Sequence, residues 1–264
     1  MKITDLTLPL QDGMNYYCTG HLPWEVAFKA QHTVPKESKL DLGSFTMFSE
    51  AGTRYLCVLP KKLGEVFKNE LNKLIMKDAV MLHVPKESKE ENLITAEEMK
   101  AGINNCRARS GDAIILHTGH GDNEKYYKMG ERWETAGPGL SPEAVDPLVD
   151  YLTKMKCSLF GYDTGNISWQ STHRCSLHGP LWDARKPHLA LGSPEAKEIG
   201  DRYINSGQFA AEFKELIKLM RFSDMLGCVV NCGAVKAERF KLIIGPLKVV
   251  DWAYVPATAF AIEE

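Results

Sequence analysis

Short apolar runs bounded by polar turns recur along the chain and predict strands. Residues 3 to 10 alternate polar and apolar side chains, which is typical of a half-buried strand. Residues 43 to 58 predict two strands joined by a turn at Gly52. Further strands are predicted at residues 78 to 84, 113 to 116 and 158 to 164, where the apolar residues are nearly continuous.

Helix signals alternate with these strands. Thr95-Ala96-Glu97-Glu98 is a capping box, in which the Thr and Glu side chains satisfy backbone N–H groups of the first turn. Ser141-Pro142-Glu143 combines an N-cap residue, a first-turn proline and an acidic side chain. Leu148, Leu152 and Met155 give the second helix an apolar stripe. A short helix is also predicted at residues 63 to 74.

Composition indicates a globular chain and gives no reason to expect a nucleic-acid or membrane partner. With 264 residues and 44% hydrophobic content, the chain can bury a substantial core, and we interpret residues 1–264 as a single domain. The formal charge is −2 and basic residues are interleaved with acidic ones, so we expect no nucleic-acid partner. Residues 1 to 6 lack a signal core and no apolar run approaches the roughly 18 residues of a spanning helix. We therefore expect a cytoplasmic protein with no membrane partner.

The seven cysteines are odd in number, scattered and without a C-x-x-C pair. This usage suits a reducing compartment better than a disulfide framework or a zinc knuckle. We expect most of them to be small buried hydrophobic residues.

The segment around Gly52 carries the most specific motif. With Gly52-Thr53 as the register, it resembles the signature H-x-G-T-H-x-D-x-P-x-H of the cyclase family of hydrolases, which includes bacterial kynurenine formamidases and isatin hydrolases. The resemblance implies a site for one or two divalent cations, zinc or manganese, that polarise a carbonyl and supply hydroxide. The metal ligands of the family are replaced here by Glu50, Arg54, Leu56 and Pro60.

Electrostatics argues against a metal at this position. A guanidinium about 4 Å from a divalent ion is repelled by roughly 8 kcal/mol at an effective dielectric near 20. Structural metal affinities of about 10–16 kcal/mol come from complete ligand sets. We therefore expect no metal here and no other cofactor.

Other segments are similar to the family along nearly the whole chain. The resemblance implies an α/β fold of the swivelling β/β/α type, with a central mixed β-sheet or barrel-like core and flanking helices. It also implies a family-atypical insertion at about residues 165–227, followed by a strand, residues 227 to 232, that lacks the family's glutamate. The matching segments are residues 5–10, 78–80, 94–97, 111–119, 137–144, 159–164, 239–249 and 256–262.

Two interpretations of Glu50 and Arg54 stay open. They form a salt bridge that fills the former metal position, or Arg54 clamps a carboxylate or stabilises an oxyanion while Glu50 acts as general base. Thr53 lies beside Arg54 and is a candidate substrate-binding residue. Tyr17 and Trp24 either line the pocket or cap the core.

Histidines supply the remaining candidates. His120 is a catalytic candidate because it follows a predicted strand, where Asp122 could join it, whereas we expect the neighbouring His117 to satisfy a backbone carbonyl. His173, a catalytic candidate, and His178, a substrate-binding candidate, lie in the insertion, which could cover the cleft as a lid. Asp163 is predicted to face the cleft and bind substrate, and with these two histidines it could instead form a displaced metal site.

Three functions are consistent with these residues. The first is a metal-independent hydrolase or lyase that acts on a small carbonyl, amide or lactone compound. The second is an inactive relative that binds a ligand or serves as a structural subunit, and the third is a hydrolase with a relocated metal. By resemblance to the family, we expect a homo-oligomer, a dimer or a tetramer.

Overall fold

The predicted strands assemble into one large sheet that closes on itself. The computed structural model describes residues 1–10, 28–32, 43–47, 52–56, 75–89, 92–129, 133, 137–165, 167, 223–247 and 254–264. Within these residues the sheet has eight strands, and the pairing of β9 with β10 closes all of them except β1 into a ring. Around the ring the order is β10 (Tyr254–Glu263), β4 (Arg54–Leu56), β8 (Asp224–Gly227), β7 (Leu159–Tyr162), β6 (Ala113–His117), β5 (Ile75–His83) and β9 (Arg239–Pro246).

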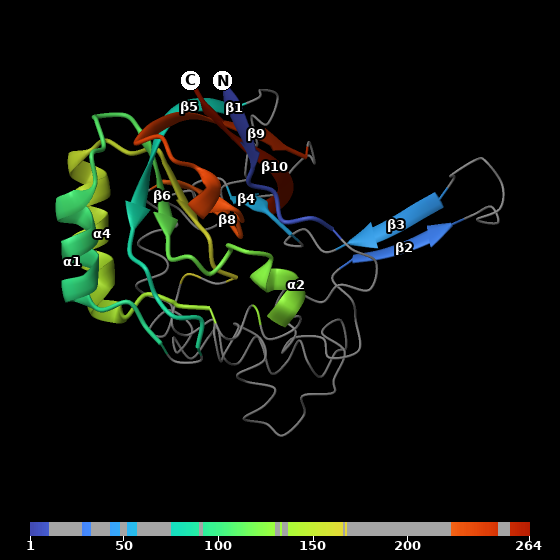
Figure 1. Ribbon diagram of the computed structural model, residues 1–264, viewed down its shortest axis with the longest axis horizontal. Coiled ribbons are helices and arrows are strands. Elements are labelled where there is room, and N and C mark those ends of the chain that lie inside the picture. Colours follow the sequence, from blue (N-terminus) through green and yellow to red (C-terminus); the bar gives the residue numbers. More distant parts are fainter. Residues whose placement is uncertain are drawn as a thin grey trace, which may run out of the picture.

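Strand direction divides the barrel into two halves. β5, β6, β7 and β8 are mutually parallel, whereas β4, β9 and β10 join by antiparallel pairs. β1 (Lys2–Asp5) pairs with β10 outside the ring, so the two chain ends lie side by side (Figure 1). The four parallel strands therefore direct their carboxyl ends to one rim of the barrel, which is where loops of α/β proteins usually gather ligands.

Alternation along each strand separates an inner core from an outer core. Ala113 and Ile115 of β6 belong to the cluster that fills the barrel, whereas Ile114 and Leu116 belong to the cluster outside it. The outer cluster includes the apolar stripes of α1 (Ala96–Asn105) and α4 (Pro142–Lys154), which pack together beside β5 and β6 (Figure 1). The predicted α/β class, with a barrel-like core and flanking helices, is confirmed.

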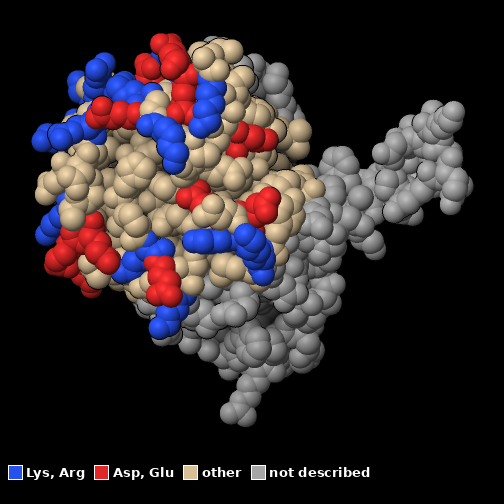
Figure 2. Space-filling model, viewed as in Figure 1, with Lys and Arg blue, Asp and Glu red and all other residues tan. Residues whose placement is uncertain are grey.

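Smaller elements lie outside the ring. α2 (Lys125–Met129) follows the β6 loop, and the 3-10 helix η2 (Cys232–Ala234) follows β8. β2 (Phe28–His32) and β3 (Gly43–Met47) form a separate antiparallel ribbon that projects from the barrel in Figure 1. Acidic and basic side chains of the described residues are intermixed on the face shown in Figure 2, in keeping with the near-neutral net charge.

Most local predictions are confirmed within the described residues. Thr95 caps α1 with both bonds of the capping box, and α4 begins at Pro142, although the Ser141 side chain makes no capping bond. The strand predicted at residues 227–232 is wrong, because β8 ends at Gly227 and the chain then turns away. Cys228 and Asn231 both have φ of 57°, a left-handed conformation that a strand does not accept. The helix predicted at residues 63–74 lies outside the described residues.

Candidate active site at the rim of the barrel

Several of the predicted site residues gather at one rim of the barrel. The rim receives the carboxyl ends of β5 to β8, and also the start of β4, because β4 is antiparallel to β8 with Arg54 opposite Gly227. The rim thus brings together side chains that are far apart in the sequence. These are Thr53, Arg54, His83, His117, His120, Asp122 and Asp163.

Strand alternation places these side chains on two faces of the barrel wall. Tyr55 belongs to the inner core and Leu56 to the outer core, so Arg54, two residues before Leu56, is on the outer face. By the same alternation, His83 follows Met81 and His117 follows Ile115 on the inner face. The rim therefore carries two separate polar groupings. We call the one around Arg54 on the outer face the Arg54 side, and the one around His83 and His117 on the inner face the His117 side.

Arg54 is deeply buried at the outer face. Arg54 is only 4% exposed, and its Nη2 donates a 2.6 Å hydrogen bond to the Gly165 carbonyl. Gly227 makes room for it: a Cβ there would lie 3.2 Å from Arg54 Nε and 2.6 Å from the Tyr162 hydroxyl oxygen. Burying a guanidinium costs several kcal/mol unless it is well partnered. The site therefore holds a fixed positive charge in a confined space.

Two of the four positions that hold metal ligands in the family, Arg54 and Leu56, lie within the described residues, and neither side chain can bind a cation. Arg54 has no lone pair and carries a positive charge, and Leu56, 4% exposed, packs in the outer apolar core. Glu50 and Pro60 lie outside the described residues. Within the described part of the chain, no group of three or more His, Cys, Asp or Glu side chains is arranged to hold a metal.

Thr53 joins three segments of the chain beneath Arg54. Its Oγ1 donates to the Cys228 carbonyl at 2.8 Å and accepts from the Leu8 backbone N–H at 2.7 Å. Its hydroxyl thus links the N-terminal segment to the turn after β8. This placement gives Thr53 a clear structural use, and its predicted role in substrate binding stays a prediction.

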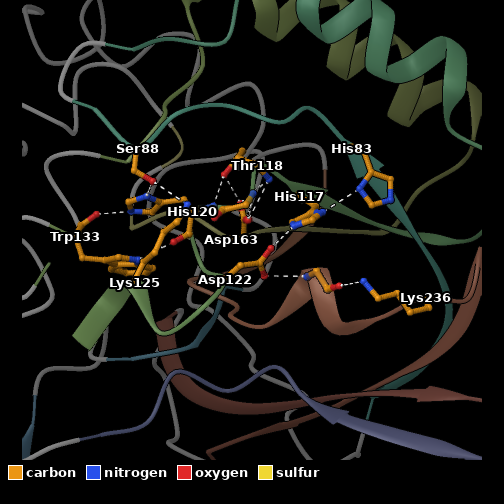
Figure 3. Close-up of polar contacts among 12 residues, drawn as sticks. His83, Ser88, His117, Thr118, His120, Asp122, Lys125, Trp133, Asp163 and Lys236 are labelled. Carbon is orange, nitrogen blue, oxygen red and sulfur yellow. Dashed lines mark hydrogen bonds and ion pairs between the residues drawn. The ribbon is translucent and has the colours of Figure 1, made fainter. Parts of the chain in front are cut away.

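Asp163 anchors the loop that follows β6. It is fully buried and accepts hydrogen bonds of 2.7–3.0 Å from the Thr118 N–H and hydroxyl and from the Gly119 N–H (Figure 3). Burial raises the pKa of this carboxyl, although the nearby His117 and these three donors oppose the shift. Asp163 lies at the end of β7 as predicted, and these three donors fix its position.

His120 is buried behind that loop and is held in a neutral form. Its Nε2 donates to the Trp133 carbonyl and its Nδ1 accepts from the Ser88 hydroxyl at 2.8 Å, while the ring stacks on Trp133 at 5.0 Å. Burial lowers the pKa of His120 to about 4, because the charged ring would lose its hydration. Both ring nitrogens are engaged by the protein, which bears on the predicted catalytic role.

On the His117 side, Asp122 contacts His117 rather than joining His120 as the sequence suggested, and His83 is a further partner that the sequence did not reveal. His117 Nε2 lies 2.7 Å from Asp122 Oδ2, and His117 Nδ1 lies 2.9 Å from His83 Nδ1 (Figure 3). The expectation that His117 satisfies a backbone carbonyl is therefore wrong. His117 at the end of β6 and Asp122 in the following loop are close in sequence and were a detectable signal, whereas His83 becomes a partner only through the parallel pairing of β5 with β6.

The pKa values of His117 and His83 shift in opposite directions. Burial opposes a charge on His117, but the Asp122 hydrogen bond and the negative charges of Asp163 and Asp122 outweigh it and raise its pKa. Burial, together with the nearby His117, lowers the pKa of His83. His117 therefore favours a positive charge, and His83 stays neutral at pH 7.

The other predicted site residues cannot be placed. Glu50, His173, Tyr17, Trp24 and His178 all lie outside the described residues. Their predicted roles in catalysis, substrate binding or a displaced metal site stay predictions.

A family comparison accounts for this architecture. The sequence model of the Cyclase family, described as "Putative cyclase", matches residues 4–168, which is more than half of the chain. The chain belongs to the Cyclase family. The match extends from β1 past β7 and contains the segments that place Arg54, His117 and Asp163.

Solved structures of similar fold include metal-dependent and isatin hydrolases. Isatin hydrolase A from Labrenzia aggregata is 16% identical, with a TM-score of 0.62 over 100% of this chain and 94% of the other. An isatin hydrolase bound to thioisatinate also has 16% identity and a TM-score of 0.62, over 98% and 91%. A "predicted metal-dependent hydrolase" from Bacillus stearothermophilus has 14% identity and a TM-score of 0.54, over 98% and 97%. At these identities the likeness shows the shared fold.

Two further findings concern curated relatives and membrane helices. A search of curated proteins finds no match to this Cyclase-family chain. Among the described residues, no helix is both long and apolar enough to cross a membrane. Family membership, together with the hydrolases that share the fold, indicates a hydrolytic enzyme.

Proposed function

We propose that the protein hydrolyses a small cyclic or aromatic carbonyl compound, and that Arg54 supplies the positive charge that the family obtains from a metal. The substrate class comprises cyclic amides such as isatin, aryl formamides and lactones. The observation that carries the proposal is the buried Arg54 guanidinium at the position of a family metal ligand. Such a buried charge would stabilise an oxygen that becomes negative during the reaction.

The proposed reaction uses water as the nucleophile. Water oxygen adds to the carbonyl carbon, and Glu50, the predicted general base, accepts the proton. The carbonyl oxygen becomes an oxyanion, which an N–H of Arg54 stabilises. The C–N or C–O bond then breaks as Glu50 returns its proton to the leaving nitrogen or oxygen, and the new carboxylic acid gives its remaining proton to solvent to become a carboxylate. The bond from Arg54 to the Gly165 carbonyl orients the planar guanidinium for this task.

Substitution of Arg54 tests the proposal directly. Hydrolysis of isatin, an aryl formamide and an aromatic lactone is measured for wild type, Arg54→Ala and Arg54→Lys, after treatment with a chelator. Loss of an oxyanion donor should lower kcat by about 10²–10³-fold in Arg54→Ala, with partial activity in Arg54→Lys. Unchanged turnover in Arg54→Ala would exclude the residue from the mechanism.

Arg239→Ala is the matched control. Arg239 pairs with both carboxylate oxygens of Asp112, which precedes β6 and so lies at the opposite rim of the barrel. This variant removes a guanidinium from the same barrel, and its turnover should equal that of wild type. An equal loss in both variants would attribute the effect to weakened folding, which circular dichroism and thermal unfolding would show.

A non-catalytic relative is the second candidate, and one observation favours it. The polar groups of Thr53, Asp163 and His120 are all bonded within the protein, as a closed and purely structural rim requires. Such a protein would show ligand-induced thermal stabilisation without turnover of any compound in the panel. Turnover that Arg54→Ala abolishes would rule this candidate out.

The proposal also covers the metal requirement, the oligomeric state and the cellular location of the protein. We infer that turnover survives chelation, that the chain is a homo-oligomer and that it acts in the cytoplasm. Stoichiometric zinc or manganese whose removal abolishes turnover would instead support a hydrolase with a relocated metal. Light scattering coupled to size-exclusion chromatography measures the oligomer, and a dimer or tetramer is expected.

A further inference from the structure

The ends of β5 and β6 bring two imidazole nitrogens together at the mouth of the barrel. His83 and His117 are direct partners in the parallel register, and both side chains are on the inner face. Their Nδ1 atoms are 2.9 Å apart and their rings meet edge to face at 73° (Figure 3). His83 is exposed, so solvent reaches this pair of nitrogens.

Asp122 fixes the orientation of His117. A carboxylate only accepts hydrogen bonds, so the 2.7 Å contact places a proton on His117 Nε2 and directs Nδ1 toward His83. Asp122 is itself held, because its Oδ1 accepts a 2.8 Å bond from the Gly233 N–H. A Cβ on Gly233 would lie 2.4 Å from Asp122 Oδ2, so only glycine allows this close approach. The imidazole is thus oriented by a carboxylate that η2 holds in place.

We propose that His83 and His117 form a binding site for a divalent transition-metal ion, with both Nδ1 atoms as ligands and Asp122 as the outer carboxylate. Two Zn–N bonds of about 2.0–2.1 Å at a tetrahedral angle place their nitrogens roughly 3.3–3.4 Å apart. A hydrogen bond joins the two Nδ1 atoms at 2.9 Å, so an ion would replace the shared proton and the nitrogens would separate by roughly a few tenths of an ångström. Metal-bound histidines usually donate their other ring N–H to a carboxylate, which is the relation of His117 to Asp122.

The charges around the pair both favour and oppose a cation. Asp122 and Asp163 favour positive charge on His117, and an ion at its Nδ1 would experience the same attraction. The lowered pKa of His83 favours the neutral imidazole, which is the form that binds a metal. Lys236 acts in the opposite direction, because its ammonium lowers the pKa of both histidines; its Nζ donates to the Gly233 carbonyl. Removal of this ammonium should tighten metal binding.

The ligand type restricts the ion. Imidazole nitrogens select zinc, nickel and copper over magnesium and calcium, which prefer oxygen ligands. Water would complete the coordination, since His83 faces solvent. The site differs in residues and in barrel face from the position of the family motif, where Arg54 stands. It is therefore a separate site, whether or not Arg54 is catalytic.

Zinc titration of the metal-stripped full chain tests the site. Calorimetry at pH 7.5 should show one equivalent of Zn²⁺ that His83→Ala loses, while any weaker binding elsewhere in the chain stays. Asp122→Asn should weaken this equivalent by about 10–100-fold, as loss of an outer carboxylate does. Lys236→Met should strengthen it. His83→Gln provides a second variant that retains a polar partner for His117, and circular dichroism confirms the fold of each protein.

Spectroscopy gives a readout that does not depend on turnover. X-ray absorption of the zinc-loaded protein should show two imidazole ligands in wild type and fewer in His83→Gln. The proposal is overturned if wild type takes up no zinc, or if His83→Ala and His83→Gln bind it as wild type does. Because none of these measurements uses a substrate, their outcome is independent of the hydrolase assay.

Discussion

His117 ends β6 and His120 lies in the loop that follows, three residues later, but their surroundings differ in electrostatic character. His117 is at the mouth of the barrel, 13% exposed in its side chain, next to two carboxylates that favour its charged form. His120 is fully buried between Ser88 and Trp133, which bind its neutral form. The comparison shows that surroundings, more than residue type or sequence position, decide which of two histidines can take part in proton or metal chemistry.

Asp163→Ala should have the largest effect, because Asp163 anchors the loop that separates the two histidines. The substitution leaves three donors of Thr118 and Gly119 without their acceptor, and each buried unsatisfied group costs roughly 1–3 kcal/mol. We expect the free energy of unfolding to fall by about 3–5 kcal/mol. Urea unfolding measures this loss.

Asp163→Asn is the control for that experiment. The amide keeps one carbonyl oxygen for the same donors, so it should lose less stability than the alanine variant. If Asp163→Ala costs less than about 1 kcal/mol, the loop is held by other contacts and the anchoring role is wrong.

Acid should destabilise the protein through His120. Its pKa is about 4 in the folded protein and about 6.5 when unfolded, so below pH 6.5 the unfolded state binds a proton that the folded state does not. Stability should therefore fall between pH 6.5 and 4, by on the order of 3 kcal/mol from this residue. Urea unfolding at several pH values should show this slope in wild type and a shallower one in His120→Gln. Equal slopes in the two proteins would mean that His120 titrates normally.

His117 should produce a smaller effect of opposite sign. Its folded pKa is raised, so its contribution to stability is fully present below the unfolded value of about 6.5. That contribution is lost as the pH rises through the folded pKa. The stability difference between wild type and His117→Gln should therefore shrink on going from pH 6 to alkaline pH. Urea unfolding measures the difference, and a difference that grows over this range would contradict the assigned shift.

Local sequence signals predicted the elements of the fold but not the closure of the sheet. The capping box at Thr95 and the apolar run of β6 depend on neighbouring residues, and both are where the sequence placed them. The ring closes through the pairing of β9 with β10 and of β10 with β4, and the latter joins residues near positions 55 and 255. No local pattern encodes such long-range register, so the resemblance to the family carried that part of the prediction.

The candidate site was predictable to a similar degree. Asp163 at the end of β7 followed from the strand pattern, and Arg54 followed from the motif register. The His83–His117 pair did not, because it depends on a register between strands that are about thirty residues apart. The neutral state of His120 also escaped prediction, since it depends on contacts with Ser88 and Trp133 that the sequence does not reveal.

The position of β10 has a consequence for the synthesis of the chain. β10 pairs with β1, β4 and β9, so an emerging polypeptide that lacks it leaves three strands with exposed edges. During translation the earlier strands must wait for β10 to leave the ribosome, and a stalled or truncated product would present those edges to chaperones and to other nascent chains.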